Sequence, residues 1–227
     1  MNKETDFGLI FDMDGTLLDN NPFHFNAWKS LCLEFEKDLT VEDYKKHISG
    51  INSEQTIKYL FGESLSASEI QELKIRKDAY YKRMIAEGVK PLDGLTRLLR
   101  QARQAAIPMA VASSASPQNI LHVLDLLRIA SFFSVVADST MVTWGKPAPD
   151  IFLLASRLMG VPPQKCIVFE DSFNGIRGAK QAGMFTIAIS TSHNPEELNR
   201  IADRVISDYR SLTVPKLKKM LHSHDTH

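Results

Sequence analysis

The chain has 227 residues, and its 27 lysines and arginines balance its 27 aspartates and glutamates, so the formal net charge is zero. This balance gives no support for nucleic acid as a partner. No apolar run approaches the roughly 20 residues of a membrane span, and the polar first residues lack the apolar segment of a signal peptide. We therefore expect a cytoplasmic monomer that binds neither nucleic acid nor membrane. Its two cysteines, Cys32 and Cys166, lie in apolar contexts, which favours buried thiols over a disulfide.

The first predicted element is a short buried strand, Phe7–Phe11 (FGLIF). It is followed by residues 20–88, in which no convincing strand is found. Apolar residues at helical spacing predict a helix at Phe23–Phe35, and Thr40–Asp43 and Ser66–Glu69 have the form of helix N-terminal capping boxes. We expect this region to be an all-helical insert.

After the insert, short apolar runs alternate with segments of helical spacing. The expected strands are Pro108–Ala112, Val135–Ala137, Cys166–Phe169 and Thr186–Ile189. The expected helices are Leu92–Ala105, Pro117–Leu127, Asp150–Met159 and Asn174–Ala182. This alternation predicts an α/β fold with a parallel sheet and helices on both of its faces. The last residues, 222–227, are expected to be a frayed end.

Polar side chains follow three of the predicted strands where each strand ends: Asp12 and Asp14, Ser113 and Ser114, and Glu170 and Asp171. The carboxyl ends of parallel strands meet at one edge of a sheet, where ligands bind, so these side chains are expected to line one crevice. Lys146, in the loop after Val135–Ala137, can reach the same edge. Carboxylates without cysteine or histidine suit a hard cation, and we predict Mg²⁺.

Each of these residues also has a simpler explanation when it is taken alone. The Asp-Gly pair at 14–15 is a good turn dipeptide, so this segment could form a β-hairpin. Lys146 could be a solvated loop lysine, Ser113 a strand-end residue, and the acidic pair 170–171 the start of a helix. An EF-hand calcium loop is excluded, because its third acidic position, its glycine and its final glutamate are missing. The combination of all these groups favours a functional site.

Four segments resemble, in order, the four motifs of the haloacid dehalogenase-like phosphohydrolase superfamily: DMDGTLLD, VASSAS, GKPAPDIF and FEDSFNGIRGAKQAG. The helical insert resembles the four-helix cap of the subgroup that includes beta-phosphoglucomutase, at HFNAWKSL, GINSEQTI and IRKDAYYKRMI. The resemblance covers most of the chain and weakens after about Ile189. It implies a Rossmann-like catalytic core of residues 1–18 and 89–227 and a helical cap domain of residues 19–88.

The resemblance also implies catalytic roles. Asp12 would attack phosphorus and form an aspartyl phosphate, and Asp14 would be the general acid and base. Ser113 and Lys146 would neutralise and orient the oxygens of the transferred phosphoryl group, with Ser114 as a further substrate contact.

For the metal, the resemblance implies that Asp12, Asp171 and the backbone carbonyl of Asp14 hold Mg²⁺. Glu170 is a further candidate ligand, although neighbouring residues on a strand point to opposite faces.

Three residues of the helical insert are expected to contribute to substrate recognition. His24 matches a cap histidine that helps to position the acid and base residue, and Arg76 and Lys77 match basic residues that face the substrate. An ordinary charged helix face explains Arg76 and Lys77 equally well. Trp28, one helical turn from His24, is expected to lie in the core of the insert.

Two departures from the subgroup favour a phosphatase over a phosphomutase. The cap arginine with which the mutase grips the distal phosphate aligns with Ser53, and a Lys-Asn pair of the mutase aligns with Ser116 and Pro117. Serine is no substitute for a bidentate arginine. We therefore expect a Mg²⁺-dependent phosphatase of a small phosphorylated metabolite, such as a sugar phosphate. The alternatives are a beta-phosphoglucomutase that works through a sugar bisphosphate, and a catalytically silent phosphometabolite-binding protein.

Overall fold

The computed structural model of the chain describes residues 7–49, 51–86 and 88–224. The chain divides into two compact units, one formed by Met1–Asp19 with Lys90–His227 and the other by Asn20–Val89. The six strands found among the described residues all lie in the first unit, which we call the sheet unit. The second unit, which we call the helical unit, interrupts it in sequence directly after the first strand.

The sheet unit is built on parallel strands in the order β3-β2-β1-β4-β5-β6. The strands are β1 (Gly8–Phe11), β2 (Met109–Ala112), β3 (Val135–Ala137), β4 (Cys166–Glu170), β5 (Phe185–Ile189) and β6 (Arg204–Ile206). The chain order reverses between β1 and β4, which are neighbours in the sheet. In open parallel sheets, ligands bind outside the carboxyl ends of the strands at such a reversal. The predicted α/β fold with a parallel sheet is confirmed.

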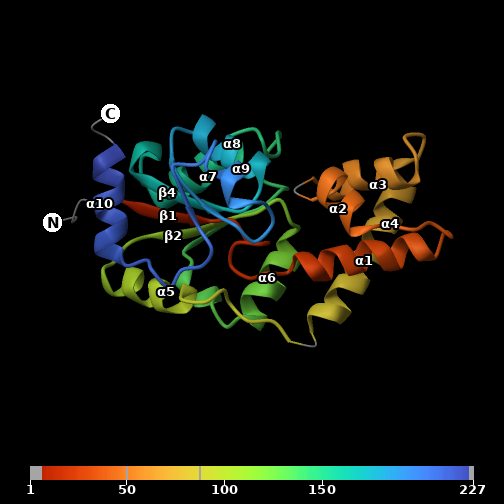
Figure 1. Ribbon diagram of the computed structural model, residues 1–227, viewed down its shortest axis with the longest axis horizontal. Coiled ribbons are helices and arrows are strands. Elements are labelled where there is room, and N and C mark those ends of the chain that lie inside the picture. The colour runs from red at the N-terminus through yellow and green to blue at the C-terminus, as the bar shows by residue number, and fades with distance from the viewer. Residues whose placement is uncertain (1–6, 50, 87, 225–227) are drawn as a thin grey trace. The chain divides into compact units, whose positions relative to one another are not determined.

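Helices cover both faces of this sheet. They are α5 (Leu95–Gln104), α6 (Pro117–Leu126), α7 (Asp150–Met159), α8 (Phe173–Gln181), α9 (Pro195–Leu198) and α10 (Val214–His224), with short 3-10 helices at Ala130–Phe132 and Pro163–Lys165. α7 packs against β1, β2 and β3, and α8 packs against β4 and β5. Figure 1 shows α7 and α8 on one side of the sheet and α5 and α6 on the other. The sheet is therefore buried on both faces, as its continuous apolar strands require.

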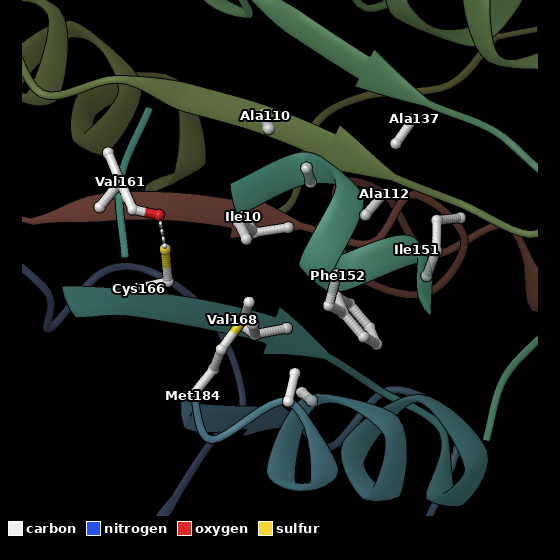
Figure 2. Packing of buried hydrophobic residues seen from close by; sticks show 13 residues of the cluster. Ile10, Ala110, Ala112, Ala137, Ile151, Phe152, Val161, Cys166, Val168 and Met184 are labelled. Carbon is white, nitrogen blue, oxygen red and sulfur yellow. Dashed lines mark hydrogen bonds between the residues drawn. The ribbon is translucent and has the colours of Figure 1, made fainter. Parts of the chain in front are cut away.

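Small residues let α7 lie close to the sheet. Ala110 and Ala112 on β2 and Ala155 on α7 are fully buried, and they leave room for the larger Ile10 and Phe152 (Figure 2). Full burial of one large apolar side chain stabilises a fold by about 1.5–3 kcal/mol. This layer of the core holds the carboxyl ends of β1, β2 and β4 in a fixed register.

Both cysteines are buried free thiols, as predicted. The Cys166 thiol donates to the carbonyl oxygen of Val161 at a sulfur–oxygen distance of 3.8 Å (Figure 2). Burial raises the pKa of Cys166 to about 11, so this thiol is protonated at neutral pH.

The helical unit contains α1 (Asn21–Leu33), α2 (Val41–His47), α3 (Ser53–Phe61) and α4 (Ala67–Ile85). Side chains cap three of these helices: Thr40 of α2 accepts a hydrogen bond from the Asp43 amide, Asn52 caps α3, and Ser66 with Glu69 forms a reciprocal capping box on α4. α1 and α4 pack together around a core of eight buried residues: Trp28, Leu31, Cys32, Leu39, Tyr44, Ile48, Ile57 and Leu73. Trp28 is thus a core residue, as predicted.

Some elements differ from the predicted ones. α5 begins at Leu95 instead of Leu92, because Gly94 takes a left-handed φ of 84° as the N-terminal cap. The edge strand β6 was not predicted, since it has only three residues and its Arg204 is exposed. The prediction of a frayed end is wrong for residues 222–224, because α10 runs to His224. This helix buries Leu217 and Leu221, which lie one turn apart. Residues 225–227 lie outside the described part of the chain.

The helices that the structure describes include none with the length and apolarity needed to cross a membrane.

Candidate active site

The carboxyl ends of β1, β2 and β4 meet at one edge of the sheet, and the polar residues that follow them form a cluster there. Asp12 follows β1, and its backbone amide donates to the carbonyl oxygen of Phe169 on β4 at 2.9 Å. Because β1 pairs in parallel with both β2 and β4, the segment FGLIFDMDGTLLD is not a β-hairpin. The aspartates instead stand at the point where the sheet order reverses.

Lys146 is the centre of this cluster. Its ammonium donates to Asp12 Oδ1 at 2.6 Å, to Glu170 Oε1 at 2.7 Å and to the carbonyl oxygen of Ala112 at 3.2 Å. An ammonium has three protons, so each of them has an acceptor. The side chain is only 6% exposed, and the ring of Phe152 lies 4.8 Å from the nitrogen. Lys146 is therefore a buried charge, not a solvated loop lysine.

Burial and like charges dominate the electrostatics of the cluster. Burial, reinforced by the charges of Glu170 and Asp14, raises the pKa of Asp12 to about 8, although Lys146 acts in the opposite direction. Burial and the charges of Glu170 and Asp12 likewise raise the pKa of Asp171 well above its usual range. Burial alone would lower the pKa of Lys146, but the charges of Asp12 and Glu170 outweigh it, so its pKa is raised. Lys146 is thus the stable cation of the site.

The donor set suits a divalent cation. Three carboxylates of the cluster are buried, those of Asp12, Glu170 and Asp171, and the Lys146 ammonium pairs with the first two of them. The excess negative charge and the all-oxygen donors are those that Mg²⁺ prefers. No group of three or more histidine, cysteine, aspartate or glutamate side chains that could hold a metal ion occurs among the described residues. Mg²⁺ commonly takes only one or two carboxylates and completes its shell with water and substrate phosphate.

Glu170 uses both of its carboxylate oxygens within the protein. Oε1 accepts from Lys146, and Oε2 accepts from the backbone amides of Asp171 and Ser172, both at 2.8 Å, and from the Ser172 hydroxyl at 3.0 Å. Gly175 of α8 packs directly against this carboxylate, which occupies the space that a Cβ atom on residue 175 would need. Glu170 is therefore held by Lys146 and by the turn that starts α8, and these hydrogen bonds fix the orientation of its carboxylate.

The remaining predicted residues of the sheet unit differ in exposure. Ser113 is buried, its amide donates to the Ala137 carbonyl oxygen at 3.0 Å, and its Oγ accepts from the Ala115 amide at 3.2 Å. Ser114 is exposed. Asp14 is half-buried, and its charge raises the pKa values of both Asp12 and Asp171, so it belongs to the same cluster.

Of the three predicted residues of the helical unit, Lys77 and His24 contact each other and Arg76 has other partners. The Lys77 ammonium lies 3.1 Å from His24 Nδ1, which must be the acceptor because an ammonium only donates. Lys77 is 4% exposed, and its nitrogen lies over the rings of Trp28 and Tyr81. A lysine buried in this way is not part of an ordinary charged helix face.

Arg76, unlike Lys77, belongs to an ordinary charged helix face. It forms an ion pair with Glu34, lies 3.7 Å from a carboxylate oxygen of Glu72 and stacks over the ring of Phe35. The structure therefore does not group Arg76 with His24 and Lys77.

Sequence reasoning missed three hydroxyls from the last part of the chain, of which one contacts the cluster and two contact the turn that follows Asp14. The Ser192 hydroxyl donates to Asp171 Oδ2, and the Thr191 hydroxyl donates to the Gly15 carbonyl oxygen at 2.6 Å. The buried Tyr209 hydroxyl donates to the Thr16 carbonyl oxygen at 3.0 Å. A signal was available for the first two, since Thr191 and Ser192 closely follow a strand, β5, as the other site residues do.

Comparison with known proteins agrees with this geometry. A profile of haloacid dehalogenase-like hydrolases matches residues 9–189. The chain is 34% identical over 189 residues to the beta-phosphoglucomutase of Bacillus subtilis (strain 168), an alignment that covers 80% of this chain and 82% of that protein. It is 32% identical over 176 residues to the phosphorylated carbohydrates phosphatase of Thermotoga maritima, covering 78% of this chain and 81% of that protein.

Solved structures give the same result. The crystal structure of beta-phosphoglucomutase from Clostridium difficile matches with a TM-score of 0.87 at 26% sequence identity, and the match covers 97% of this chain and 99% of that one. The four motifs, the sheet order and these relatives agree, and the chain belongs to the family of haloacid dehalogenase-like hydrolases.

Proposed function

We propose that this protein is a Mg²⁺-dependent phosphatase that releases phosphate from a small phosphorylated carbohydrate. The observation that carries the proposal is the bond of Lys146 to Asp12 Oδ1 at 2.6 Å, in a cluster that also contains Asp14 and Asp171. A nucleophilic carboxylate, a nearby second carboxylate and a fixed cation are the groups that phosphoryl transfer requires. The relatives named for phosphorylated carbohydrates support the substrate class.

Asp12 is the proposed nucleophile. Its Oδ1 accepts from Lys146, which leaves Oδ2 to attack phosphorus while the bond from phosphorus to the leaving oxygen breaks. The product of this step is an aspartyl phosphate on Asp12. Lys146 and the buried Ser113 would neutralise and orient the phosphoryl oxygens, because catalysis of this transfer depends on positioning and charge.

Asp14 is the proposed acid and base. In the first step its carboxylic acid gives a proton to the leaving oxygen of the sugar. In the second step its carboxylate takes a proton from water, which attacks the phosphorus and frees Asp12. Asp14 is half-buried and its charge acts on both Asp12 and Asp171, which supports a role beside the nucleophile.

Asp12, Asp171 and the backbone carbonyl of Asp14 are the proposed metal ligands, and Glu170 is proposed as the group that holds Lys146 in place. When bound, Mg²⁺ supplies positive charge that offsets these carboxylates and the phosphoryl oxygens.

We further propose that the helical unit is a cap that recognises the sugar, with Lys77 and His24 as its polar groups. The Lys77 nitrogen lies over the rings of Trp28 and Tyr81 and contacts His24 at 3.1 Å and Asp78 at 3.5 Å. Its side chain is therefore ordered by the protein, so binding through it costs little side-chain entropy.

A phosphomutase is the second candidate, and the 34% identity to beta-phosphoglucomutase favours it. Against it, Ser53, the first residue of α3, stands where that enzyme has an arginine for the distal phosphate. A mutase must hold a second phosphate while the first is transferred, and serine lacks both the charge and the bidentate geometry for this.

The test is a phosphate-release assay over sugar phosphates, nucleotides and pyrophosphate, with and without Mg²⁺. Phosphate release from sugar phosphates that stops when Mg²⁺ is removed is the expected result. One further reaction contains beta-glucose 1-phosphate and glucose 1,6-bisphosphate. Glucose 6-phosphate formed there without phosphate release would identify a mutase. Binding without turnover on every substrate would identify a silent binding protein.

A further inference from the structure

The loop Ser190–Asn194, which we call the clamp loop, connects β5 to α9 at the carboxyl edge of the sheet. It starts directly after residue 189, where the match to the family profile ends. None of its residues belongs to the nucleophile, acid, base or metal-ligand set proposed above. Two of its hydroxyls nevertheless contact that set or its supporting turn.

Ser192 contacts the proposed metal site directly. Its hydroxyl donates to Oδ2 of Asp171, a side chain that is only 5% exposed. A hydrogen bond to one oxygen fixes the rotation of a carboxylate. The other oxygen, Oδ1, is then held in one direction and remains for a cation.

Thr191 contacts the backbone of the same site on the β1 side, next to Asp14. Its hydroxyl donates to the Gly15 carbonyl oxygen at 2.6 Å, in the turn that follows Asp14. Gly15 has a left-handed φ of 71°, so this turn has a specific shape that the hydrogen bond stabilises. The clamp loop thus joins the turn after β1 to the carboxylate after β4.

The clamp loop is itself anchored at both ends. The Ser190 amide donates to the Ile206 carbonyl oxygen at 2.9 Å, and Asn194 caps α9 by accepting from the Glu196 amide at 2.9 Å. Between these ends the His193 ring packs against Phe173 of α8, with ring centroids 4.2 Å apart. A loop fixed in this way can hold its hydroxyls in place without help from a ligand.

We propose that Ser192 is a positioning residue that preorganises Asp171 for divalent cation binding, with Thr191 fixing the clamp loop to the Asp14 turn. The inference rests on the Mg²⁺ dependence proposed above. Groups that orient a metal ligand through a hydrogen bond change metal affinity by about 10–100-fold when they are removed.

The test measures Mg²⁺ binding to the full chain by titration calorimetry in the absence of substrate. S192A is expected to bind Mg²⁺ about 10–100-fold more weakly than the wild type. S192T keeps the hydroxyl and is expected to restore most of the affinity. S190A is the matched control: it removes a hydroxyl from the same loop, but one that is 3.4 Å from a backbone carbonyl oxygen and does not contact Asp171.

A second readout separates positioning from loss of structure. If Ser192 acts through metal affinity, the kcat of S192A approaches the wild-type value when Mg²⁺ is raised well above its new dissociation constant. A kcat that stays low at saturating Mg²⁺, or a wild-type affinity in S192A, overturns the inference and leaves the proposed function standing. A wild-type protein that binds no Mg²⁺ but hydrolyses sugar phosphates overturns both the metal dependence and the inference.

Discussion

At the scale of single residues, Lys146 determines the charge balance of the site. Its ammonium is the only positive group within hydrogen-bonding distance of Asp12 and Glu170 in the described part of the chain. Removing it leaves two buried carboxylates without a cation beside them, which is far more costly than removing an exposed charge.

We predict that Lys146→Met lowers kcat for phosphate release by about 10²–10³-fold, the usual effect of removing one group that stabilises a developing negative charge. Methionine keeps much of the length of the side chain and removes only the charge and the hydrogen bonds. The measurement is steady-state kinetics at saturating Mg²⁺. Lys219→Met, on the exposed side of α10, is the matched control and should behave as the wild type. A Lys146→Met variant with full activity would contradict the proposed role.

Asp14→Asn tests the assignment of acid and base. An asparagine cannot protonate a sugar leaving group, so turnover of sugar phosphates should fall by about 10²–10⁴-fold. An aryl phosphate such as p-nitrophenyl phosphate needs no acid in the first step, yet water attack in the second step still needs a base. With this substrate we expect a burst of nitrophenol close to one equivalent, followed by very slow turnover.

The matching observation is a phosphoryl group on Asp12, detected by mass spectrometry of acid-quenched Asp14→Asn. Asp12→Asn, which lacks the nucleophile, should show neither burst nor adduct. A burst in Asp12→Asn, or steady fast turnover in Asp14→Asn, would exclude the proposed division of roles.

At the scale of elements, α8 and β4 are joined through Glu170. The first turn of α8 approaches the end of β4 so closely that a Cβ atom on Gly175 would overlap the Glu170 carboxylate. That carboxylate also accepts three hydrogen bonds from the turn and one from Lys146. The packing of a helix on a strand and the orientation of Lys146 therefore depend on one glycine.

We predict that Gly175→Ala destabilises the protein by roughly 1–3 kcal/mol, the usual cost of overpacking, although alanine is otherwise the better helix former. It should also lower kcat, because the displaced carboxylate no longer holds Lys146. Urea unfolding and kinetics of the same sample measure both effects. Gly145→Ala is the control, since a Cβ atom there meets nothing within 4 Å and the backbone has no left-handed φ. Equal stability of the two variants would be inconsistent with the packing described.

At the scale of the whole molecule, each compact unit contains one buried thiol: Cys32 in the helical unit and Cys166 in the sheet unit. Both side chains belong to apolar cores, and burial raises the pKa of each thiol. Each cysteine therefore reports on the folding of one unit.

We predict that iodoacetamide at pH 8 modifies neither thiol in the native protein, because the reactive thiolate is disfavoured and inaccessible. With increasing urea, Cys32 should become reactive at a lower concentration than Cys166, since the helical unit is smaller and buries less apolar surface. Mass spectrometry of the two peptides gives both midpoints. Coincident midpoints would mean that the two units unfold together, contrary to the prediction.

Local patterns in the sequence were enough to predict the alternation of strands and helices and the residues at the strand ends. Continuous apolar runs such as GLIF and CIVF leave no polar face, so these strands must be covered on both sides. In a parallel sheet all carboxyl ends lie at one edge, which is enough to bring Asp12 and Asp171 together. These inferences need only local patterns and one rule of topology.

The contacts of each of these groups became visible only in the folded chain. Lys146 lies in a loop and Glu170 at the end of a strand, and no sequence pattern predicts their contact at 2.7 Å. This contact depends on how α7 and α8 pack on the sheet. The clamp loop is a similar case, because Ser192 reaches Asp171 only after β5 has been placed beside β4. Contacts between segments far apart in the chain follow from the packing of whole elements, and local sequence patterns carry no information about it.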